Sequence, residues 1–532
     1  MNKFIFKEGT NPNYLATICK VGELHPIEGA DKLLKTVING YDIVVPKTLN
    51  EGDIVVYFPV ETSICEGYLS ANNLYEFSEA DRNANFDEVK TLIDSMDTTE
   101  DSEMKKSYYD KAKSMCGFFN KHGRVRMIKL RGQYSMGFVA TVETIVKYKP
   151  ELNDINWESL VGTQFNYIDE DEFCKKYIPP IKTSRHGSNN HDRAWKKRTK
   201  QLKRFDRIRE DQFAFHYDTK MFAEHFKEFS PEDEVTITVK VHGTSAIYAN
   251  ILCNRKLSIW EKIKKFFGFK VKDVEYGNVY SSRGVIKNQY INPNADSYYK
   301  VDVWGAVNDL ISPYIEEGFT IYGEIVGYVP NSDKMIQKKH DYGCEPGNWK
   351  FMPYRITYTD EVGNKTEFEI HEVDEWTRNL VTENPHLANN IMFLNIVYSG
   401  KLMDLYPDID IAQHWHENVL ARMKTDKERF LMEEDEPMCK NKVPREGIVI
   451  RKKDDEYARA WKLKTARHYA KECEANDAGE VNIEDIESQS TNGWDEYLKD
   501  NVILATDGHG MPTAVMSKDL YNEMQRRNKK KK

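Results

Sequence analysis

Lys240 and Gly243 stand where two predicted strands meet, with a spacing that lets a lysine react with a bound phosphate. β-branched residues alternate with polar ones up to residue 239, and apolar residues resume at 246–248, which predicts a strand on each side. Partial desolvation lowers the pKa of an ammonium group, and the neutral amine is a nucleophile. A glycine lets a phosphate approach the backbone closely. The pair therefore predicts a nucleophilic lysine beside a phosphate site.

The same lysine–glycine spacing occurs twice more, so the spacing alone does not identify the reactive lysine. Lys129 lies in a basic segment near the front of the chain, three residues before a glycine. Lys265 lies in a segment where apolar residues have helical spacing. A chain of 532 residues should contain a few such pairs by chance. The choice among the three lysines depends on the residues that accompany each.

Charged residues at the ends and faces of later predicted strands accompany Lys240. Arg283 precedes a glycine at a strand end, where a guanidinium can bind phosphate with two hydrogen bonds. Glu324 lies inside an apolar strand, and Glu446 stands at the mouth of a β-branched one. Lys462 and Lys464 are two residues apart, so they share one face of a strand. Taken singly, such a carboxylate is often a satisfied ion pair and such a lysine pair is usually solvated.

Phe351 and Tyr354 lie in a further predicted strand, where an aromatic ring can stack on a base. With these rings, the set fits one reaction. A lysine attacks phosphorus, cations stabilise the developing charge, carboxylates hold a metal or a ribose, and an aromatic ring clamps a base. Mg²⁺ or Mn²⁺ would neutralise the phosphates and orient pyrophosphate as leaving group.

In chain order, these groups resemble the six nucleotidyltransferase motifs of covalent nucleotidyl ligases and capping enzymes. The matching segments are 240–243, 282–284, 322–324, 351–356, 446–450 and 462–464. His242 is similar to the RNA ligase branch, because DNA ligases and capping enzymes usually have aspartate there. The front of the chain, including residues 128–137, resembles the N-terminal OB domain of an ATP-dependent, nick-sealing RNA ligase family.

The resemblance implies that Lys240 attacks the α-phosphorus of ATP and forms lysyl-AMP. The AMP passes to an RNA 5′-phosphate, and a 3′-hydroxyl then displaces it and seals the strand. The residues that the resemblance places around the nucleotide are His242 and Gly243 near the phosphates, Arg283 on phosphate, Glu324 on the ribose, Tyr354 with Phe351 at the base, and Lys462 and Lys464 on the α-phosphate. Glu446 is expected to act through a metal, by way of water, and to help place Lys240.

The expected substrate is RNA with 3′-hydroxyl and 5′-phosphate ends, at a nick in a duplex, because an OB module and a basic linker can grip both sides of a break. Two alternatives stay open. A DNA ligase or capping guanylyltransferase is disfavoured by His242 and by an OB module placed first in the chain. A nucleic-acid-binding protein without activity is disfavoured because Lys240, Lys462 and Lys464 are all present.

The pattern of elements predicts an α+β chain. An OB-like β-barrel at 1–147 carries an acidic insertion at about 67–121, and a basic connecting region follows at 148–210. A nucleotidyltransferase (ATP-grasp-like) domain of antiparallel sheets flanked by helices occupies 211–475, with a largely helical insertion at about 372–440. A polar extension runs over 476–532. Candidate RNA contacts are the basic side chains Arg124, Arg126, Arg131, Lys196, Lys197 and Arg198.

Composition is that of a soluble protein, with 30% charged and 40% hydrophobic residues and a net charge of -9. The eight cysteines form no CxxC pair, and no apolar run approaches the length of a membrane span. We therefore expect a cytoplasmic monomer with no membrane partner. One segment, residues 260–267, has the spacing of a basic amphipathic helix, which is more often packed on its own core than in contact with RNA.

Overall fold

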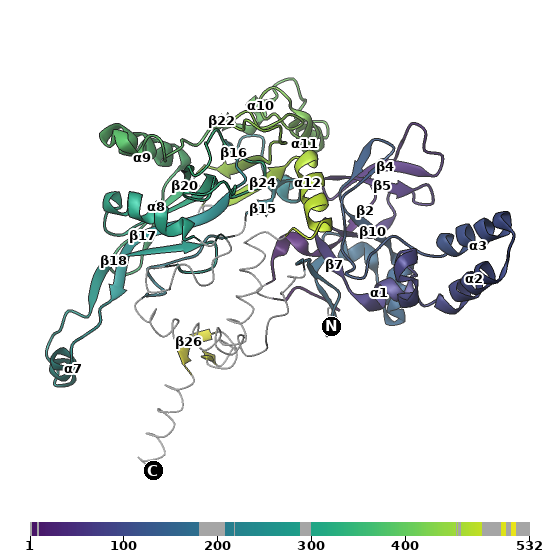
Figure 1. The fold of residues 1–532 in the computed structure, drawn as a ribbon, viewed down its shortest axis with the longest axis horizontal. Helices are drawn as coiled ribbons and strands as arrows, with labels where there is room; N and C mark the ends of the chain where they lie inside the picture. Colours follow the sequence, from purple (N-terminus) through teal and green to yellow (C-terminus); the bar gives the residue numbers. More distant parts are fainter. Residues whose placement is uncertain are drawn as a thin grey trace, which may run out of the picture.

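The computed structural model describes residues 3–7, 10–179, 208–217, 219–287, 299, 301–453, 455 and 459–480, and the backbone of 502–506 and 512–517. These residues form a mixed α+β fold in which antiparallel sheets carry helices on their flanks (Figure 1). Lys196, Lys197 and Arg198 lie outside the described residues.

Two five-stranded sheets build the part of the chain that follows residue 211. The first has the order β15 (Lys220–Met221), β24 (Ala460–Lys464), β23 (Gly447–Lys452), β16 (Glu234–Lys240) and β22 (Ile396–Lys401). The second has the order β18 (Val274–Ser282), β17 (Thr244–Asn254), β19 (Phe319–Gly327), β20 (Trp349–Thr359) and β21 (Lys365–Glu367). The chain leaves the first sheet at Lys240 and enters the second at Thr244, so residues 241–243 join the two.

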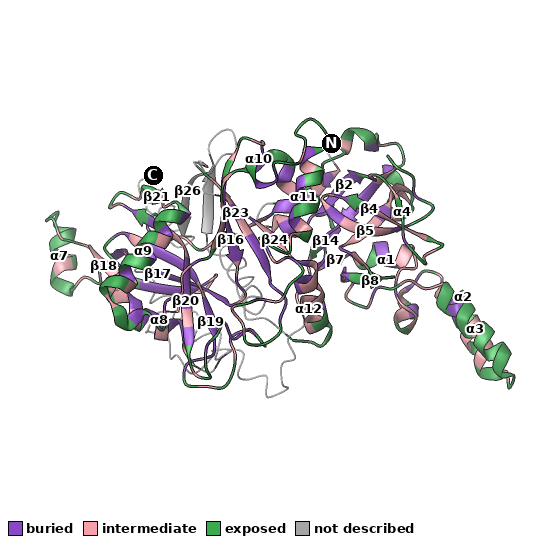
Figure 2. Cartoon of the chain, turned by 90° about the horizontal axis from the view of Figure 1, so that it is seen from above, coloured by how far each residue is buried: buried purple, intermediate pink, exposed green. Residues whose placement is uncertain are grey.

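Helices cover both sheets and close two hydrophobic cores. They include α8 (Val303–Ile311), α9 (Ile370–Glu383), α10 (Leu402–Leu405), α11 (Trp415–Thr425) and α12 (Ala466–Asp477). β16 contributes to both cores, because Val235 and Ile237 pack in one and Val239 in the other. Figure 2 shows the buried strands between exposed helical faces. The strand that ends at Lys240 is therefore held by apolar burial along its length.

The strands that the sequence predicts near the front of the chain, at 15–21, 33–38, 41–45 and 54–58, form largely where expected. They are β2 (Ala16–Lys20), β4 (Leu33–Ile38), β5 (Tyr41–Pro46) and β6 (Ile54–Phe58). Asn39 and Gly40, with φ of 50° and 80°, make the tight turn between β4 and β5.

The expected N-terminal barrel is not found, because the described strands there fall into separate small sheets, with β6 in a four-stranded sheet and β4 in a three-stranded one. Several strands have two or three residues, including β3 (His25–Pro26) and β11 (Gln164–Phe165). Such short strands do not provide the continuous staggered pairing that closure requires.

The N-terminal part and the part after residue 211 share one hydrophobic core. Tyr41 and Val55 from the front pack in the same cluster as Phe222, Ile237 and Trp461. The turn at Gly40 approaches so closely that a Cβ there would lie 2.2 Å from the carbonyl oxygen of Ala223. Removing the front of the chain would therefore expose apolar surface of the sheet that carries Lys240.

Three segments differ from expectation or add to it. The basic segment 124–131, which the sequence predicts as one strand, is a strand only at β8 (Ile128–Leu130). The segment expected to be largely helical also contains β22, which pairs with β16. The acidic segment holds α1 (Glu66–Ala71), α2 (Phe86–Thr98) and α3 (Ser102–Ser114), and α2 and α3 project from one end of the molecule (Figure 2).

α7 (Ile259–Phe266) forms where a helix was predicted, but none of its residues is buried, so the expectation that it packs on its own core is wrong. It stands at the far end of the β17–β18 hairpin (Figure 1). Among the residues that the structure describes, no helix combines the length and the apolarity needed to cross a bilayer.

Candidate functional site

Strand register places three charged residues side by side at one end of the first sheet. Lys240 on β16 pairs with Gly447 on β23, and Gly447 pairs with Lys464 on β24. Glu446 immediately precedes Gly447. Neighbouring strands in a sheet lie about 5 Å apart, so a lysine from each outer strand reaches the glutamate on the middle strand. The three groups come together because each stands where its strand begins or ends.

Glu446 is the buried centre of this row. Its Oε1 lies 2.9 Å from Lys240 Nζ and 3.5 Å from Lys464 Nζ. Its side chain is 3% exposed, whereas that of Lys240 is 24% exposed. Burial alone would raise the pKa of Glu446, but the Lys240 and Lys464 ammonium groups outweigh it and hold the pKa well below its usual range. The carboxylate is therefore ionised, and the two lysines depend on it for charge balance.

Two glycines allow this close arrangement. A Cβ at Gly447 would lie 2.1 Å from the carbonyl oxygen of Leu463, so only glycine lets β23 pair with β24 at this point. A Cβ at Gly243 would lie 2.3 Å from the carbonyl oxygen of Ile325 on β19. Gly243 therefore has a packing role in addition to the phosphate approach expected from sequence. Its N–H donates to Glu324 Oε1 at 3.1 Å, which fixes that carboxylate beside the crossing between the sheets.

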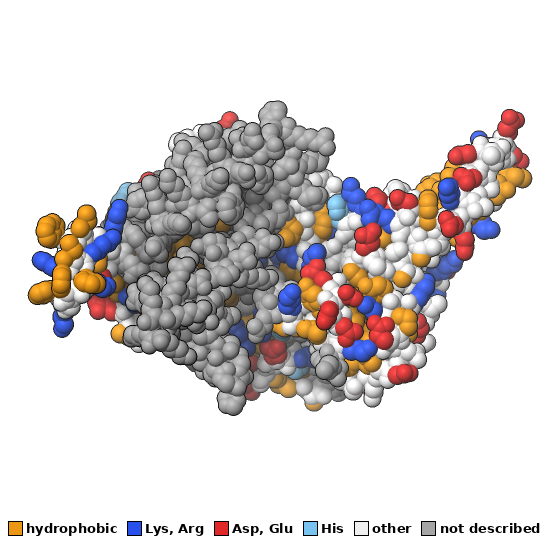
Figure 3. Space-filling model, turned by 90° about the horizontal axis from the view of Figure 1, so that it is seen from below, with side chains coloured by type: hydrophobic (Ala, Val, Ile, Leu, Met, Phe, Trp, Pro, Cys, Tyr) orange, Lys and Arg blue, Asp and Glu red, His pale blue; other side chains and the backbone are white. Residues whose placement is uncertain are grey.

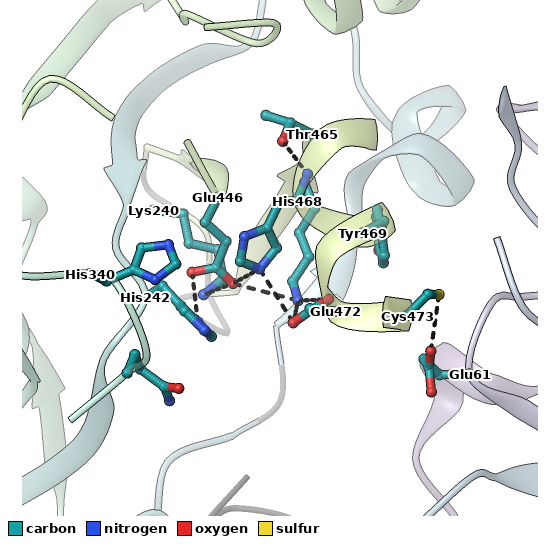
Figure 4. Close-up of polar contacts among 12 residues, drawn as sticks. Glu61, Lys240, His242, His340, Glu446, Thr465, His468, Tyr469, Glu472 and Cys473 are labelled. Carbon is teal, nitrogen blue, oxygen red and sulfur yellow. Dashed lines mark hydrogen bonds and ion pairs between the residues drawn. The ribbon is translucent and has the colours of Figure 1, made fainter. Parts of the chain in front are cut away.

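α12 supplies a second layer behind Lys464. Thr465 caps the helix by accepting from the N–H of His468. Glu472 lies one turn after His468 on this helix (Figure 4) and accepts from Lys464 Nζ at 2.8 and 3.0 Å through its two oxygens. The Lys464 ammonium holds the pKa of Glu472 well below its usual range, although burial opposes it. Lys464 is therefore positioned by two carboxylates.

Three imidazoles surround Glu446. His242 Nδ1 lies 3.8 Å from Glu446 Oε2, and His468 Nε2 lies 3.7 Å from Oε1. The rings of His242 and His340 are 4.8 Å apart. Burial lowers the pKa of His242 well below its usual range and that of His340 to about 4, so both rings are neutral at pH 7. Neutral imidazole is the form that binds metal ions.

One buried atom at this point, Glu446 Oε2, has no hydrogen bond within the described residues, whereas His468 Nε2 lies 3.3 Å from Glu472 Oε1. Buried polar atoms usually have partners, so orphaned ones need an explanation. The ligand atoms of His242, Glu446 and His468 all lie within 4.8 Å of one another. An acceptor carboxylate and two imidazole nitrogens facing one point fit a divalent cation, so the residues present suit the expected metal.

The second sheet and β23 of the first sheet together provide an aromatic and cationic wall. Tyr354 on β20 lies with its hydroxyl 3.3 Å from Ser245 Oγ, and its ring is 5.3 Å from the ring of His216. Burial lowers the pKa of His216 well below its usual range, and the charges of Arg283, Arg355, Arg451 and Lys240 lower it further. Arg451 also donates to the Tyr354 carbonyl oxygen at 3.2 Å. Several cations thus gather around one neutral ring, which suits an anionic ligand.

The structure brings together most of the predicted nucleotide residues and moves others away. Phe351 is fully buried in the core against Tyr248, so it supports the sheet and presents no ring to a base. Lys462 lies on the same strand as Lys464, at the position next to Val449. Arg283 directly follows β18 and is partly exposed. Tyr354 is partly exposed as well.

Arg124 is not available for the RNA contact expected of it. Its side chain is 1% exposed and donates to Glu61 and to Asp477 Oδ1, the latter at 2.8 Å. The reason is that residues 124–127 are irregular and turn inward against α12. Arg126 is partly buried and Arg131 is exposed.

Sequence reasoning missed the second layer of the site. Its members are His216, His340, Arg451, His468 and Glu472. The local signal for two of them was the spacing of His468 and Glu472, which places both on one face of a helix directly after the lysine pair. The others come close to Glu446 and Tyr354 only through long-range folding.

Comparison with known proteins gives a family match for this part of the chain. Residues 233–466 match the family model of RNA ligase. The chain is similar to solved structures of Naegleria gruberi RNA ligase variants. One, with ATP and Mn, has 15% identity and a TM-score of 0.45, over 87% of this chain and 99% of that one. Another, with AMP and Mn, also has 15% identity and a TM-score of 0.45, over 86% and 98%. A search of curated proteins found no match. The segment that carries the site, residues 233–466, is thus the part of the chain that matches the RNA ligase family model.

Proposed function

We propose that the protein is an ATP-dependent RNA ligase that joins a 3′-hydroxyl and a 5′-phosphate, with Lys240 as nucleophile. The observation that carries the proposal is the row of Lys240, Glu446 and Lys464, in which both ammonium groups lie within 3.5 Å of one buried carboxylate. The RNA ligase family match covers all three residues.

Lys240 has to become a neutral amine before it reacts. Its ion pair with Glu446 has to loosen as the proton passes to solvent water, which reaches the partly exposed Lys240 side chain. Lys464 lies 3.5 Å from the same Glu446 oxygen and can balance the carboxylate once Lys240 is neutral. The lone pair of Lys240 Nζ then forms a bond to the α-phosphorus of ATP, the bond from that phosphorus to the bridging oxygen breaks, and pyrophosphate leaves with the electron pair.

His242, Glu446 and His468 would hold the divalent metal, through their own atoms or through water. The metal would neutralise phosphate charge and assist the departure of pyrophosphate. Imidazole nitrogen favours first-row transition ions over Mg²⁺, so this donor set supports Mn²⁺ in particular.

The remaining nucleotide would lie along the second sheet. Glu324, fixed by the Gly243 N–H, is placed to accept from ribose hydroxyls. Tyr354 offers the ring for the base beside His216. Arg283, with Arg451 and Lys462, would bind phosphates of ATP or of the RNA end. At this part of the site the cationic side chains outnumber the carboxylates, which favours binding of phosphates.

The second and third steps act on RNA. The AMP on Lys240 passes to the 5′-phosphate of RNA, and attack by the 3′-hydroxyl releases AMP as the new phosphodiester forms. A nick in a duplex remains the expected substrate, with Arg126, Arg131 and the basic residues 196–198 as candidate contacts with the backbone. An OB-like role of the N-terminal part in that grip also belongs to this proposal.

A strand-joining assay tests the function. A duplex with one nick is prepared in four versions, in which the nicked strand and the opposite strand are each RNA or DNA, and single-stranded RNA is included. ATP-dependent joining of nicked RNA, with little joining of free single strands, is the expected result. Joining of nicked DNA alone would favour a DNA ligase. Transfer of GMP to RNA ends without joining would favour a capping enzyme.

A further inference from the structure

Beyond residue 249 the β17–β18 hairpin extends past β19 and out of the second sheet, and it carries α7 at its end, far from β16 (Figures 1 and 2). The two strands pair without interruption from Ala246↔Ser282 to Asn254↔Val274, so the extension is a regular ribbon. Nucleotidyl transfer as proposed above makes no use of it. Its tip is therefore a separate feature of the molecule.

The tip exposes large apolar side chains that a water-soluble surface normally hides. Trp260 is 76% exposed and Phe266 is 86% exposed. Ile259, Ile263, Phe267 and Phe269 are exposed as well. Figure 3 shows these side chains gathered at one end of the molecule with basic groups beside them. Apolar residues scattered singly need no explanation, but a contiguous set of six indicates a contact surface.

The apolar and basic residues are arranged by side of the helix. At about 100° per residue, the apolar residues of 259–267 occupy an arc of about 120°. Lys262 lies just beyond one edge of this arc and Lys264 just beyond the other. Both lysines are exposed, as are Lys270 and Lys272 after the helix. From residue 255 to 273 there are seven lysine or arginine residues and two acidic ones, a net charge of +5.

The helix is built to fold at this exposed position. Ser258 Oγ accepts from the N–H of Glu261, and Glu261 accepts from the N–H of Ser258, which is a complete capping box. Arg255 pairs with Glu261, and Lys265 pairs with Asp273 at the other end. The tip is therefore a preformed element whose apolar face is held outward, which distinguishes it from a strand of unfolded chain.

We propose that this tip docks on the surface of a lipid bilayer that contains anionic lipids. A short helix with aromatic and aliphatic residues on one face and lysines along both edges inserts its apolar face between headgroups while the lysines contact lipid phosphates. RNA fits less well, because Ile259 and Ile263 occupy the middle of the apolar arc between the rings, and the lysines lie at the edges of the arc, away from its centre. A second copy fits less well, because two tips of charge +5 repel each other. The absence of a spanning run in the sequence does not bear on such interfacial docking.

Vesicle sedimentation with the full-length protein tests the proposal. Vesicles of phosphatidylcholine alone are compared with vesicles that also contain phosphatidylserine. Three variants are compared with the unchanged protein: Trp260→Ser/Phe266→Ser, Lys262→Glu/Lys264→Glu, and the control Val362→Ser. Val362 is 77% exposed in the turn between β20 and β21, so it matches the exposure of the tip without its basic surroundings. None of these substitutions touches a core, so folding is checked simply by unfolding temperature.

The protein is expected to sediment with the phosphatidylserine vesicles and far less with phosphatidylcholine alone. The apparent affinity should fall at least about tenfold in each tip variant and stay unchanged in Val362→Ser. Equal sedimentation of the tip variants and the unchanged protein would overturn the proposal, as would no sedimentation with either vesicle. A concentration-dependent dimer that Trp260→Ser/Phe266→Ser abolishes, or an RNA affinity lost in that variant without vesicle binding in the unchanged protein, would also overturn it.

Discussion

Replacing Arg124 by methionine should destabilise the whole protein, because this guanidinium connects the N-terminal part to the helix behind the site. Arg124 pairs with Glu61 through two hydrogen bonds and reaches Asp477 at the end of α12. Methionine keeps the apolar contacts of the side chain but leaves Glu61, 13% exposed, without its cation. Burial raises the pKa of Glu61, with Arg124 opposing the shift, so the carboxylate depends on this partner.

The expected loss is about 3 kcal/mol in the free energy of unfolding. Removing one partner of a buried ion pair costs about 3–5 kcal/mol. The lower end applies here because Glu61 still accepts from Asn476 Nδ2 at 3.1 Å. The pair with Asp477 adds under about 1 kcal/mol, since that carboxylate is 44% exposed. Because the N-terminal part and the sheet of Lys240 share a core, both should unfold in one transition.

Chemical denaturation followed by fluorescence and circular dichroism measures this effect. Arg126→Met is the matched control: its side chain is 30% exposed and lies 3.9 Å from Asp477, so it should cost under about 0.5 kcal/mol. Arg124→Met/Glu61→Gln should be more stable than Arg124→Met alone, since no charge is left unpaired. The reasoning is refuted if Arg124→Met unfolds at the same denaturant concentration as Arg126→Met while its affinity for RNA falls.

Three further predictions concern the layer around Glu446. Glu472→Gln should raise the ATP concentration for half-maximal self-labelling about tenfold, because Lys464 loses its nearest carboxylate. Glu472→Asp keeps a carboxylate and should retain part of the affinity for ATP. Equal ATP concentrations for the unchanged protein and both variants would contradict this. His340→Gln should make the free energy of unfolding depend less on pH in the acid range. The pKa of His340 is about 4 in the folded protein and higher in the unfolded chain, so the unchanged protein loses up to about 3 kcal/mol of stability as pH falls from about 6.5 to about 4. An unchanged pH profile of unfolding in the variant would exclude this role. After removal of divalent metal, Mn²⁺ should restore self-labelling at a lower concentration than Mg²⁺. In His468→Ala, the Mn²⁺ and Mg²⁺ concentrations that restore self-labelling should become similar. A preference of the unchanged protein for Mg²⁺ would argue against imidazole ligation.

Local pattern in the sequence predicted strands near the front of the chain and those that carry the candidate site residues. Alternation and turn residues located β4, β5 and β6, and the order of strand-end charges selected Lys240 over Lys129 and Lys265. The pairing of Lys240 with Gly447, and of Gly447 with Lys464, then follows from strand register. These features depend on residues close in the sequence or on the period of a strand, which a single sequence contains.

Features that depend on long-range packing could not be predicted in this way. No face of β22 is fully buried. Residues 396–401 therefore lack the alternation of apolar and polar residues that predicts a strand, and the sequence instead places them within a largely helical segment. The sequence around Arg124 does not indicate whether its side chain faces solvent or Glu61. The position of α12 decides this, because Arg124 donates to Cys473 and Asp477 on that helix. His340 meets His242 across about a hundred residues of sequence, and no local pattern indicates the contact.

The central claim is that Lys240 is the nucleophile, and the most direct test is to locate the covalent label. The protein is incubated with ATP labelled at the α-phosphate and a divalent metal, quenched in acid, digested and analysed by mass spectrometry. AMP attached to Lys240 is the predicted result, with no label in Lys240→Ala and full labelling in Lys129→Ala and Lys265→Ala. Absence of label from ATP, or label that persists in Lys240→Ala, would contradict the account.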